Sequence, residues 1–114
     1  MVVVDLNPIN RYHALVIPRQ HFEYLVDVPD ELLAHLFLTT KRVSLAIRRA
    51  CHPIAIHHLT DDDLSDGKYN LVAHFKIHII PRFPDDGVAI TWTRSHMSPS
   101  ARSSIASAIQ LHLA

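Results

Sequence analysis

Residues His74–Arg82, HFKIHIIPR, are the most informative stretch of this chain. If they form a β-strand, His74, Lys76 and His78 share one face of it, because side chains alternate along a strand. The residues between them are apolar and suit a buried core. Three nitrogen bases, each about 7 Å from the next, then stand in a row on the other face. Such a row is suited to binding a phosphate, coordinating a metal or attacking phosphorus.

Size and composition predict one small soluble domain that spans residues 1–114. The chain is 48% hydrophobic, which is enough for a core, and it has no apolar run long enough to span a membrane. Its formal net charge of +0 argues against bulk nucleic-acid binding. The single cysteine, Cys51, excludes an internal disulfide framework and a zinc site with paired cysteines. We therefore expect a cytoplasmic protein with no membrane partner.

Turn residues and apolar periodicity divide the chain into strands and helices. The predicted strands cover residues 2–6, 13–17, 54–59 and 71–80, with a further short strand at 88–92. The predicted helices begin at Pro29 and at Ser98-Pro99, and the second belongs to a C-terminal extension over residues 94–114. This order, β-β-α-β-β-(β)-α, predicts an α+β fold in which helices cover an antiparallel sheet.

The first predicted helix has clear signals at both ends. Asp30 and Glu31 lie in its first turn, where carboxylates suit the positive end of the helix dipole. Arg48 and Arg49 lie in its last turn, and Pro53 marks the stop. Apolar residues keep helical spacing between these ends, so we expect a long central helix.

The motif around the two histidines resembles the signature of the histidine triad (HIT) family, in which alternate histidines on a strand are followed by Pro-Arg or a similar exit. The sequence DLNP at residues 5–8 and HALVIPRQH at residues 13–21 are similar to the first hairpin of that family. The sequence LFLTTKRV at residues 36–43 is similar to the central helix of its fragile-histidine-triad branch. The resemblance covers roughly residues 2–92.

The resemblance implies a HIT-like fold and a homodimer that binds a purine nucleotide or nucleotide conjugate. Family members split a bond at the α-phosphorus through a covalent nucleotidyl-histidine. By the same resemblance, His74 and His78 match the outer histidines of the triad. The matches outside the triad are Asp5 for the ribose hydroxyls, Leu6 for the base, and Asp63 and Asn70 at positions that bind phosphate.

The main departure from the family pattern is Lys76, which stands where the nucleophilic histidine is expected. An unperturbed lysine with a pKa of about 10.4 has under about 0.1% free amine at pH 7. The exchange therefore forfeits about 4 kcal/mol in available nucleophile. A second departure is that the first β-structure of the family, often with a zinc-binding cysteine pair, has no counterpart, because this chain begins inside the next strand.

Three functions remain open from the sequence. The first is a hydrolase or nucleotidyl transferase, with Lys76 or a water as attacker and the two outer histidines stabilising phosphoryl charge. The second is an inactive nucleotide-binding pseudoenzyme that serves as a sensor or adaptor. The third and weakest is a metal site built on His74, His78 and Asp63. We predict no cofactor. We expect His13 and His21 to be packing or surface residues, with the alternative that His21 approaches the pocket.

Overall fold

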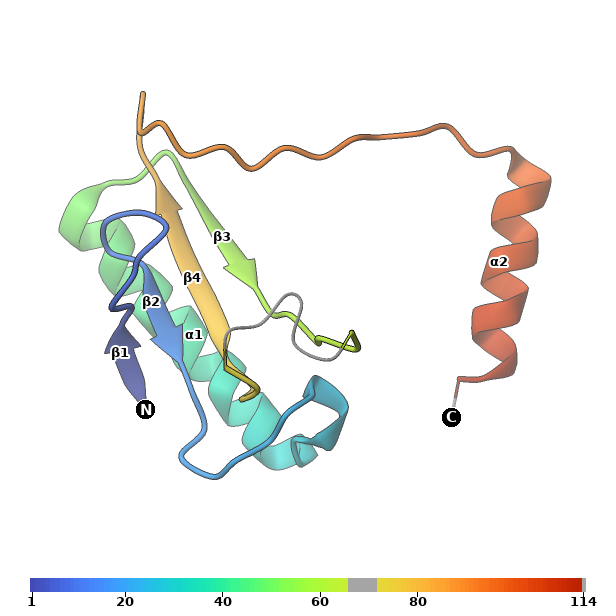
Figure 1. The fold of residues 1–114 in the computed structure, drawn as a ribbon, viewed down its shortest axis with the longest axis horizontal. Helices are drawn as coiled ribbons and strands as arrows, with labels where there is room; N and C mark the ends of the chain where they lie inside the picture. Colours follow the sequence, from blue (N-terminus) through green and yellow to red (C-terminus); the bar gives the residue numbers. More distant parts are fainter. Residues whose placement is uncertain (66–71, 114) are drawn as a thin grey trace.

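The computed structural model describes residues 1–65 and 72–113. Two strands and a short 3-10 helix come first, followed by a long helix, two more strands and a final helix (Figure 1). Their bounds are β1 Val2–Val4, β2 Ala14–Val16, η1 Leu25–Asp27, α1 Asp30–Cys51, β3 Ala55–Leu59, β4 Ile77–Arg82 and α2 Pro99–Leu111. The α+β class is confirmed, with an antiparallel sheet, a long central helix and a C-terminal helix.

The strands form one antiparallel sheet in the order β1-β2-β4-β3. β1 and β2 make the predicted hairpin, and β4 lies between β2 and β3. Leu15 pairs with His78 from one side and Leu59 pairs with it from the other. His78 therefore lies on an inner strand, where two neighbouring strands fix its position.

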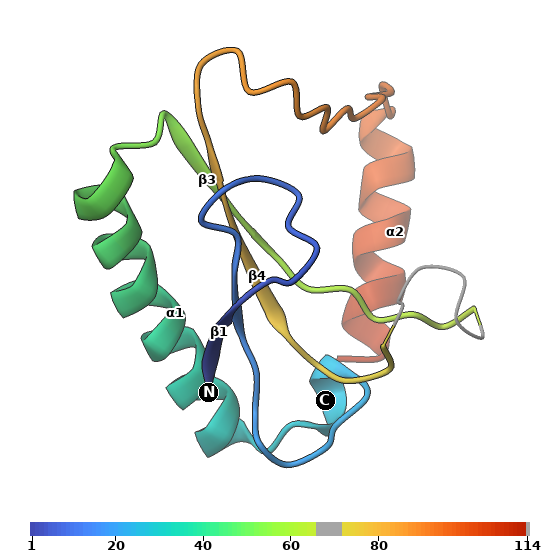
Figure 2. The same cartoon turned by 60° about the vertical axis from the view of Figure 1, so that its left-hand side comes forward.

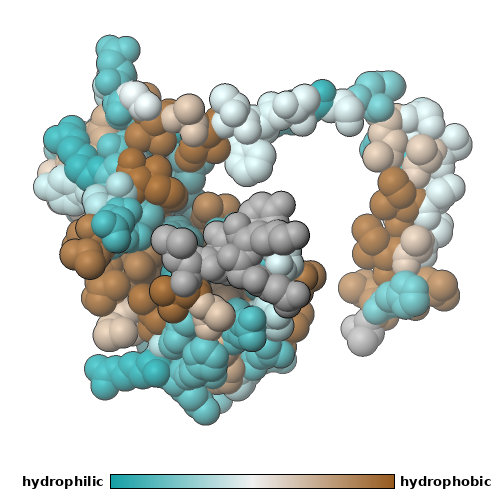
Figure 3. Space-filling model, in the orientation of Figure 1, coloured by the Kyte–Doolittle hydropathy of each residue, from teal (hydrophilic) through white to brown (hydrophobic). Residues whose placement is uncertain are grey.

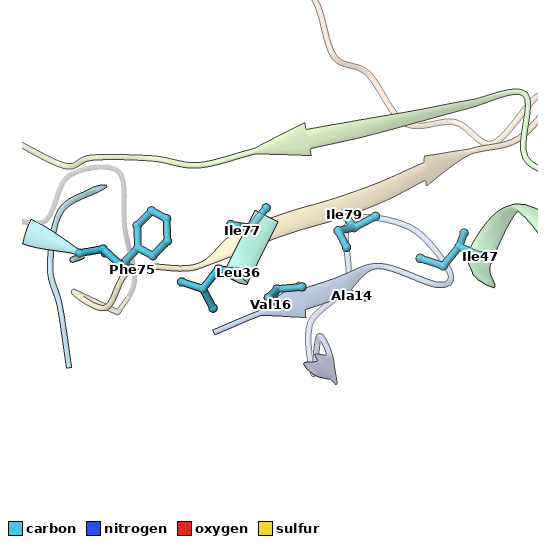
Figure 4. Close-up of a cluster of buried hydrophobic side chains, with 8 residues drawn as sticks. Ala14, Val16, Leu36, Ile47, Phe75, Ile77 and Ile79 are labelled. Atoms are coloured by element: carbon cyan, nitrogen blue, oxygen red, sulfur yellow. The ribbon is translucent and has the colours of Figure 1, made fainter. Parts of the chain in front are cut away.

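The core lies between the sheet and α1, which runs along one face of the sheet (Figure 2). Its buried residues come from β2, from α1 and from the stretch that contains β4 (Figure 4). They include Ala14, Val16, Leu36, Ile47, Phe75, Ile77 and Ile79. Burying a side chain of this size contributes about 1.5–3 kcal/mol, so these residues hold α1 against the sheet.

The predicted end signals of α1 are confirmed. Asp30 and Glu31 occupy its first turn. After its last residue, His52 takes a left-handed conformation with φ 47° and donates its N–H to the carbonyl of Arg48 at 3.2 Å, and Pro53 follows. No helix among the described residues is both long and apolar enough to cross a membrane.

β4 begins later than predicted. The sequence predicted a strand over residues 71–80, but pairing starts at Ile77. The register against β2 explains the late start. Val16 pairs with Ile77, so the same register would bring Pro18 beside Phe75, and a proline has no N–H with which to continue the ladder.

Two further expectations about the C-terminal part are wrong. Residues 88–92 form no strand, and α2 does not cover the sheet but stands apart from it (Figure 1). The turn after β4 explains both. Arg82 donates to the carbonyl of Val88 at 2.6 Å and pairs with Asp86 at 2.8 Å, so the chain folds back and then leaves the sheet.

Candidate functional site

Residues 74–79 alternate between buried and half-buried side chains, as the sequence predicted. Phe75, Ile77 and Ile79 are 3%, 0% and 0% exposed and face α1, whereas His74, Lys76 and His78 are only half-buried. The alternation persists through residues 74–76 although they precede the paired part of β4. The two histidines and the lysine therefore lie on the side of the sheet away from the core.

His74 is held by a carbonyl and by a second histidine. Its Nε2 lies 3.0 Å from the carbonyl oxygen of Pro18, which can only accept, so Nε2 carries the hydrogen. Its Nδ1 lies 3.3 Å from Nδ1 of His21, and the two rings meet edge to face at 5.1 Å. In the neutral state His74 therefore accepts from His21 while donating to the backbone.

A chain of hydrogen bonds orients His78. The N–H of Ile9 donates to Nδ1 of His13 at 3.0 Å, so the hydrogen of neutral His13 lies on Nε2. That Nε2 lies 3.0 Å from Nδ1 of His78 and donates to it. The hydrogen of neutral His78 must then be on its own Nε2. One backbone N–H thus determines the tautomer of both rings and places the hydrogen of neutral His78 on its Nε2.

Lys76 is tied to the backbone that precedes β4. Its Nζ donates to the carbonyls of His74 at 2.8 Å and Val72 at 3.1 Å. An ammonium has three hydrogens, so Nζ has one beyond those in these two hydrogen bonds. Continuing the β3–β4 register beyond Leu59 and His78 brings Asp61 beside Lys76. The site therefore contains a cation with a carboxylate near it.

Burial dominates the electrostatics of this site. It lowers the pKa of His78, and the neighbouring His13 lowers it further. It also lowers the pKa of His13, against the attraction of Asp5, whose carboxylate lies 3.6 Å from Nε2 of that ring. The pKa of Lys76 is lowered by burial as well, and Asp61 and Asp5 oppose that shift. Both histidines are therefore neutral at pH 7.

The metal-capable group within the described residues is not the predicted one. It consists of Asp5, His13 and His78, whose ligand atoms all lie within 4.8 Å of one another, rather than His74, His78 and Asp63. A metal on Nε2 of His13 would need the hydrogen to move to Nδ1, which accepts from a backbone N–H. The observed hydrogen bonds therefore favour a neutral proton relay over a metal centre.

Of the other predicted site residues, the structure describes Asp5, Leu6 and Asp63. Asp5 is half-buried beside His13, and Leu6 is 90% exposed. Asp63 accepts hydrogen bonds from the backbone and side chain of Ser65, which shape its loop. Asn70 lies outside the described residues. The roles predicted for these four in binding a nucleotide stay predictions.

Sequence analysis missed the part that His13 plays at this site. It was expected to be a packing or surface residue, and it is buried, with 1% exposed, but it also hydrogen-bonds to His78 across the β2–β4 pair. The signal was its place just before β2, two residues from Leu15, which pairs with His78. That signal could be used only with the register of β2 on β4, which depends on the pairing of two strands far apart in the chain.

A family model described as the HIT domain matches residues 1–85. Because the match covers most of the chain, the protein belongs to the HIT family, as the motif of alternating histidines predicted. The matched residues include the lysine at position 76.

Curated relatives and solved structures agree with this assignment. Protein hit of Bacillus subtilis (strain 168) is 30% identical over 118 residues, covering 100% of this chain and 79% of that protein. Adenylylsulfatase HINT3 of Arabidopsis thaliana is 29% identical over 82 residues, covering 72% of this chain and 41% of that protein. A crystal structure of a HIT family member from Bacillus subtilis matches with TM-score 0.88 at 30% identity, covering 99% of this chain and 81% of that one. This chain spans only 58% to 63% of three other HIT-like relatives.

Proposed function

We propose that this chain binds a purine nucleotide conjugate at His74, Lys76 and His78 and acts slowly at its α-phosphate as a hydrolase or nucleotidyl transferase. The observation that carries the proposal is the pairing of two donors on one face of the sheet. The relay through His13 gives His78 an Nε2–H, and Lys76 two residues away supplies an ammonium. Together they suit the negative charge of a phosphate.

The nucleoside part of the ligand has its own candidates. Asp5 can accept from ribose hydroxyls, and the exposed Leu6 can pack against a base. Asp63 and Asn70 complete the set as residues near the phosphates. The name of the Arabidopsis relative, an adenylylsulfatase, supports an adenylyl compound such as a phosphoramidate, and a dinucleoside polyphosphate belongs to the same class.

The chemistry would be displacement at phosphorus. Water or the Lys76 amine forms a bond to the α-phosphorus, and the bond to the leaving group breaks with its electron pair. The lysine is a poor attacker, because its Nζ donates to two carbonyls and its lone pair is free only after a proton leaves. Slow turnover follows from that geometry.

A second candidate function is nucleotide binding without chemistry. The same two hydrogen bonds from Lys76 favour it, because they hold the group as a fixed positive charge facing an anion. In that case the protein would serve as a sensor or adaptor.

The experiment is the exchange Lys76→His, with Lys76→Arg as the matched control. We expect Lys76→His to raise the turnover of an adenosine phosphoramidate by about 10-fold or more, because a neutral imidazole at this position is a ready nucleophile. Lys76→Arg keeps the charge but cannot attack phosphorus. Nucleotide chromatography measures the products, and intact-mass analysis detects a nucleotidyl group on the protein.

The outcomes separate the two candidates. Activity that survives in Lys76→Arg identifies water as the attacker, and activity lost there with an adduct in the parent chain identifies Lys76. If calorimetry detects binding of AMP but no product forms at high protein concentration, the hydrolase is excluded and the nucleotide-binding protein remains. No heat with AMP would refute both.

The setting of this function is also part of the proposal. We propose a single HIT-like domain over residues 1–114, with residues 94–114 as a C-terminal extension. The protein would act as a homodimer in the cytoplasm. Its pI of about 7.2 and the neutral formal charge support a small-molecule partner rather than bulk nucleic acid.

A further inference from the structure

His21 contacts the candidate site through His74. Its Nδ1 lies 3.3 Å from Nδ1 of His74, and the N–H of Phe75 donates to the carbonyl of Phe22 at 2.5 Å. The residues that follow the two histidines are therefore joined through their backbones. Phe22 also packs against the buried core, so the segment that contains His21 has a fixed place next to His74.

The hydrogen bonds of His74 decide which nitrogen of His21 carries its hydrogen. A neutral imidazole has one N–H and one bare nitrogen, so a chain of such rings keeps the polarity with which it begins. This chain begins at the carbonyl of Pro18, which can only accept and lies 3.0 Å from Nε2 of His74. The hydrogens therefore lie on Nε2 of His74 and on Nδ1 of His21, and the chain ends at the bare Nε2 of His21.

The other chain of histidines at the site ends with the opposite polarity. It begins at a backbone N–H and passes through His13 to His78, whose Nε2 carries the hydrogen. The site therefore has a donor at His78 and, through His74, an acceptor at His21. A donor suits the oxygen atoms of a phosphate, whereas a bare imidazole nitrogen repels them and suits a proton from water.

His21 lies where water can reach it. The residue is exposed, whereas His74 is half-buried and Pro18 is buried. The segment between β2 and η1, which contains His21, runs along the lower end of the core in Figure 1, and Figure 3 shows mainly hydrophilic residues there. Among the residues that the structure describes, none forms a hydrogen bond with Nε2 of His21. This nitrogen can therefore take a proton from water without first losing a partner in that part of the chain.

We propose that His21 is the general base of this site and that His74 is the residue that positions it. The inference rests on the proposed function, with water as the attacker. Nε2 of His21 takes a proton from the water while the water oxygen forms its bond to the α-phosphorus. The bond to the leaving group breaks with its electron pair, and the leaving nitrogen of a phosphoramidate takes a proton from the solvent. His21 then returns its own proton to the solvent and is neutral again.

The contact with His74 suits this role in a second way. A general base is commonly oriented by a third group that accepts a hydrogen bond from its other nitrogen. Nδ1 of His74 does this for His21, and the carbonyl of Pro18 in turn fixes His74. When His21 becomes positively charged, the bare Nδ1 of His74 and the carbonyl dipole behind it stabilise that charge.

The test is the turnover of an adenosine phosphoramidate by variants of the full chain. In His21→Asn the amide can still donate to His74, but it cannot act as a base. We expect His21→Asn to lower kcat by about 100-fold with little change in KM. The matched control His35→Asn replaces an exposed histidine on α1 and should keep the parent rate. In His21→Ala, added imidazole should raise the rate by about 10-fold, because it supplies a base in the space left by the ring.

Nitrogen-15 NMR of the parent chain at about pH 8, where imidazoles are neutral, tests the tautomers without substrate. We expect the hydrogen on Nδ1 of His21 and on Nε2 of His74. A hydrogen on Nε2 of His21 would overturn the inference, and so would a His21→Asn variant as active as the parent, which leaves the proposed function standing. A parent chain that forms no product would refute the proposed function and the base with it. Circular dichroism checks that each variant is folded.

Discussion

The protonation pattern of the site depends on one backbone group. The N–H of Ile9 sets the tautomer of His13, and His13 in turn sets that of His78. His13 touches another histidine rather than the space for a ligand, so it is a positioning residue. We expect His13 to affect function by orienting His78. We expect it to affect the pH dependence of stability through its own lowered pKa.

The first prediction at this site concerns pH. Burial lowers the pKa of His13 and His78 below the ordinary 6.5, so below that pH the unfolded chain takes up protons that the folded chain does not. The free energy of unfolding should therefore have its full value above about pH 6.5 and decrease as the pH drops toward about 5.5. Urea unfolding at several pH values measures the fall.

The variant His13→Gln tests the source of this fall. A glutamine amide can still accept from Ile9 and donate to His78, but it does not titrate. We expect His13→Gln to fold at neutral pH and to lose less stability on acidification than the parent chain. The exposed His96, which precedes α2, gives the control, and the variant His96→Gln should show the same loss of stability on acidification as the parent chain. Identical pH profiles for parent and His13→Gln would contradict the prediction.

Among the elements, α1 contributes buried residues to the core, but an unfavourable backbone conformation follows its last residue. His52 follows its last residue in the left-handed region with φ 47°, where a Cβ clashes with the backbone and glycine is favoured. The stop itself is secured by the N–H of His52 on the carbonyl of Arg48 and by Pro53. The conformation is thus imposed by the turn into β3 and not by the preference of this residue.

Replacing His52 with glycine should stabilise the fold. The exchange His52→Gly removes the strain, and we expect the free energy of unfolding to rise by about 0.5–1 kcal/mol after the entropic cost of glycine. Ala50→Gly, two residues earlier and still within α1, is the control and should lower it by about 0.5–1 kcal/mol. Urea unfolding compares the two. A loss in His52→Gly equal to that in Ala50→Gly would show that the left-handed residue is not strained.

The molecule as a whole consists of a packed core and a C-terminal arm, residues 91–113, of different local stability. The core joins α1 to the sheet through buried residues, whereas residues 91–113 are all exposed. Hydrogen bonds in an exposed short helix open easily. Local opening should therefore be far more frequent in the arm than in the core.

Hydrogen exchange should detect this difference. We expect the amides of α2 to exchange many times faster than the amides of α1 that face the core, because the hydrogen bonds of an exposed helix open without unfolding of the core. The amides of α1 serve as the internal control. Peptide-level mass spectrometry over a time course measures both. Equal protection of α1 and α2 would contradict the prediction, because it would mean that another surface covers α2.

Much of this architecture was predictable from local patterns. The alternation in residues 74–79 identified the buried and open faces, Asp30, Glu31 and Pro53 bounded α1, and Ser98 marked the start of α2. The bounds of β4 were wrong, because its late start depends on Pro18, which follows β2 and comes beside Phe75 only through the register of the sheet. The prediction that α2 covers the sheet was wrong. Apolar spacing shows that a helix has a face to bury, but it does not show which surface that face packs against.

Side-chain periodicity, end signals and a spaced motif act over a few residues, and so the chain alone was enough to establish the α+β class, the family and the row of His74, Lys76 and His78. The relay from Ile9 through His13, the carbonyls that hold Lys76 and the departure of the arm depend on contacts between residues far apart in the chain. Such contacts are set by strand register and packing, and no local pattern encodes them. The sequence therefore predicts which residues form the site, but the contacts made in the folded chain determine where their protons lie.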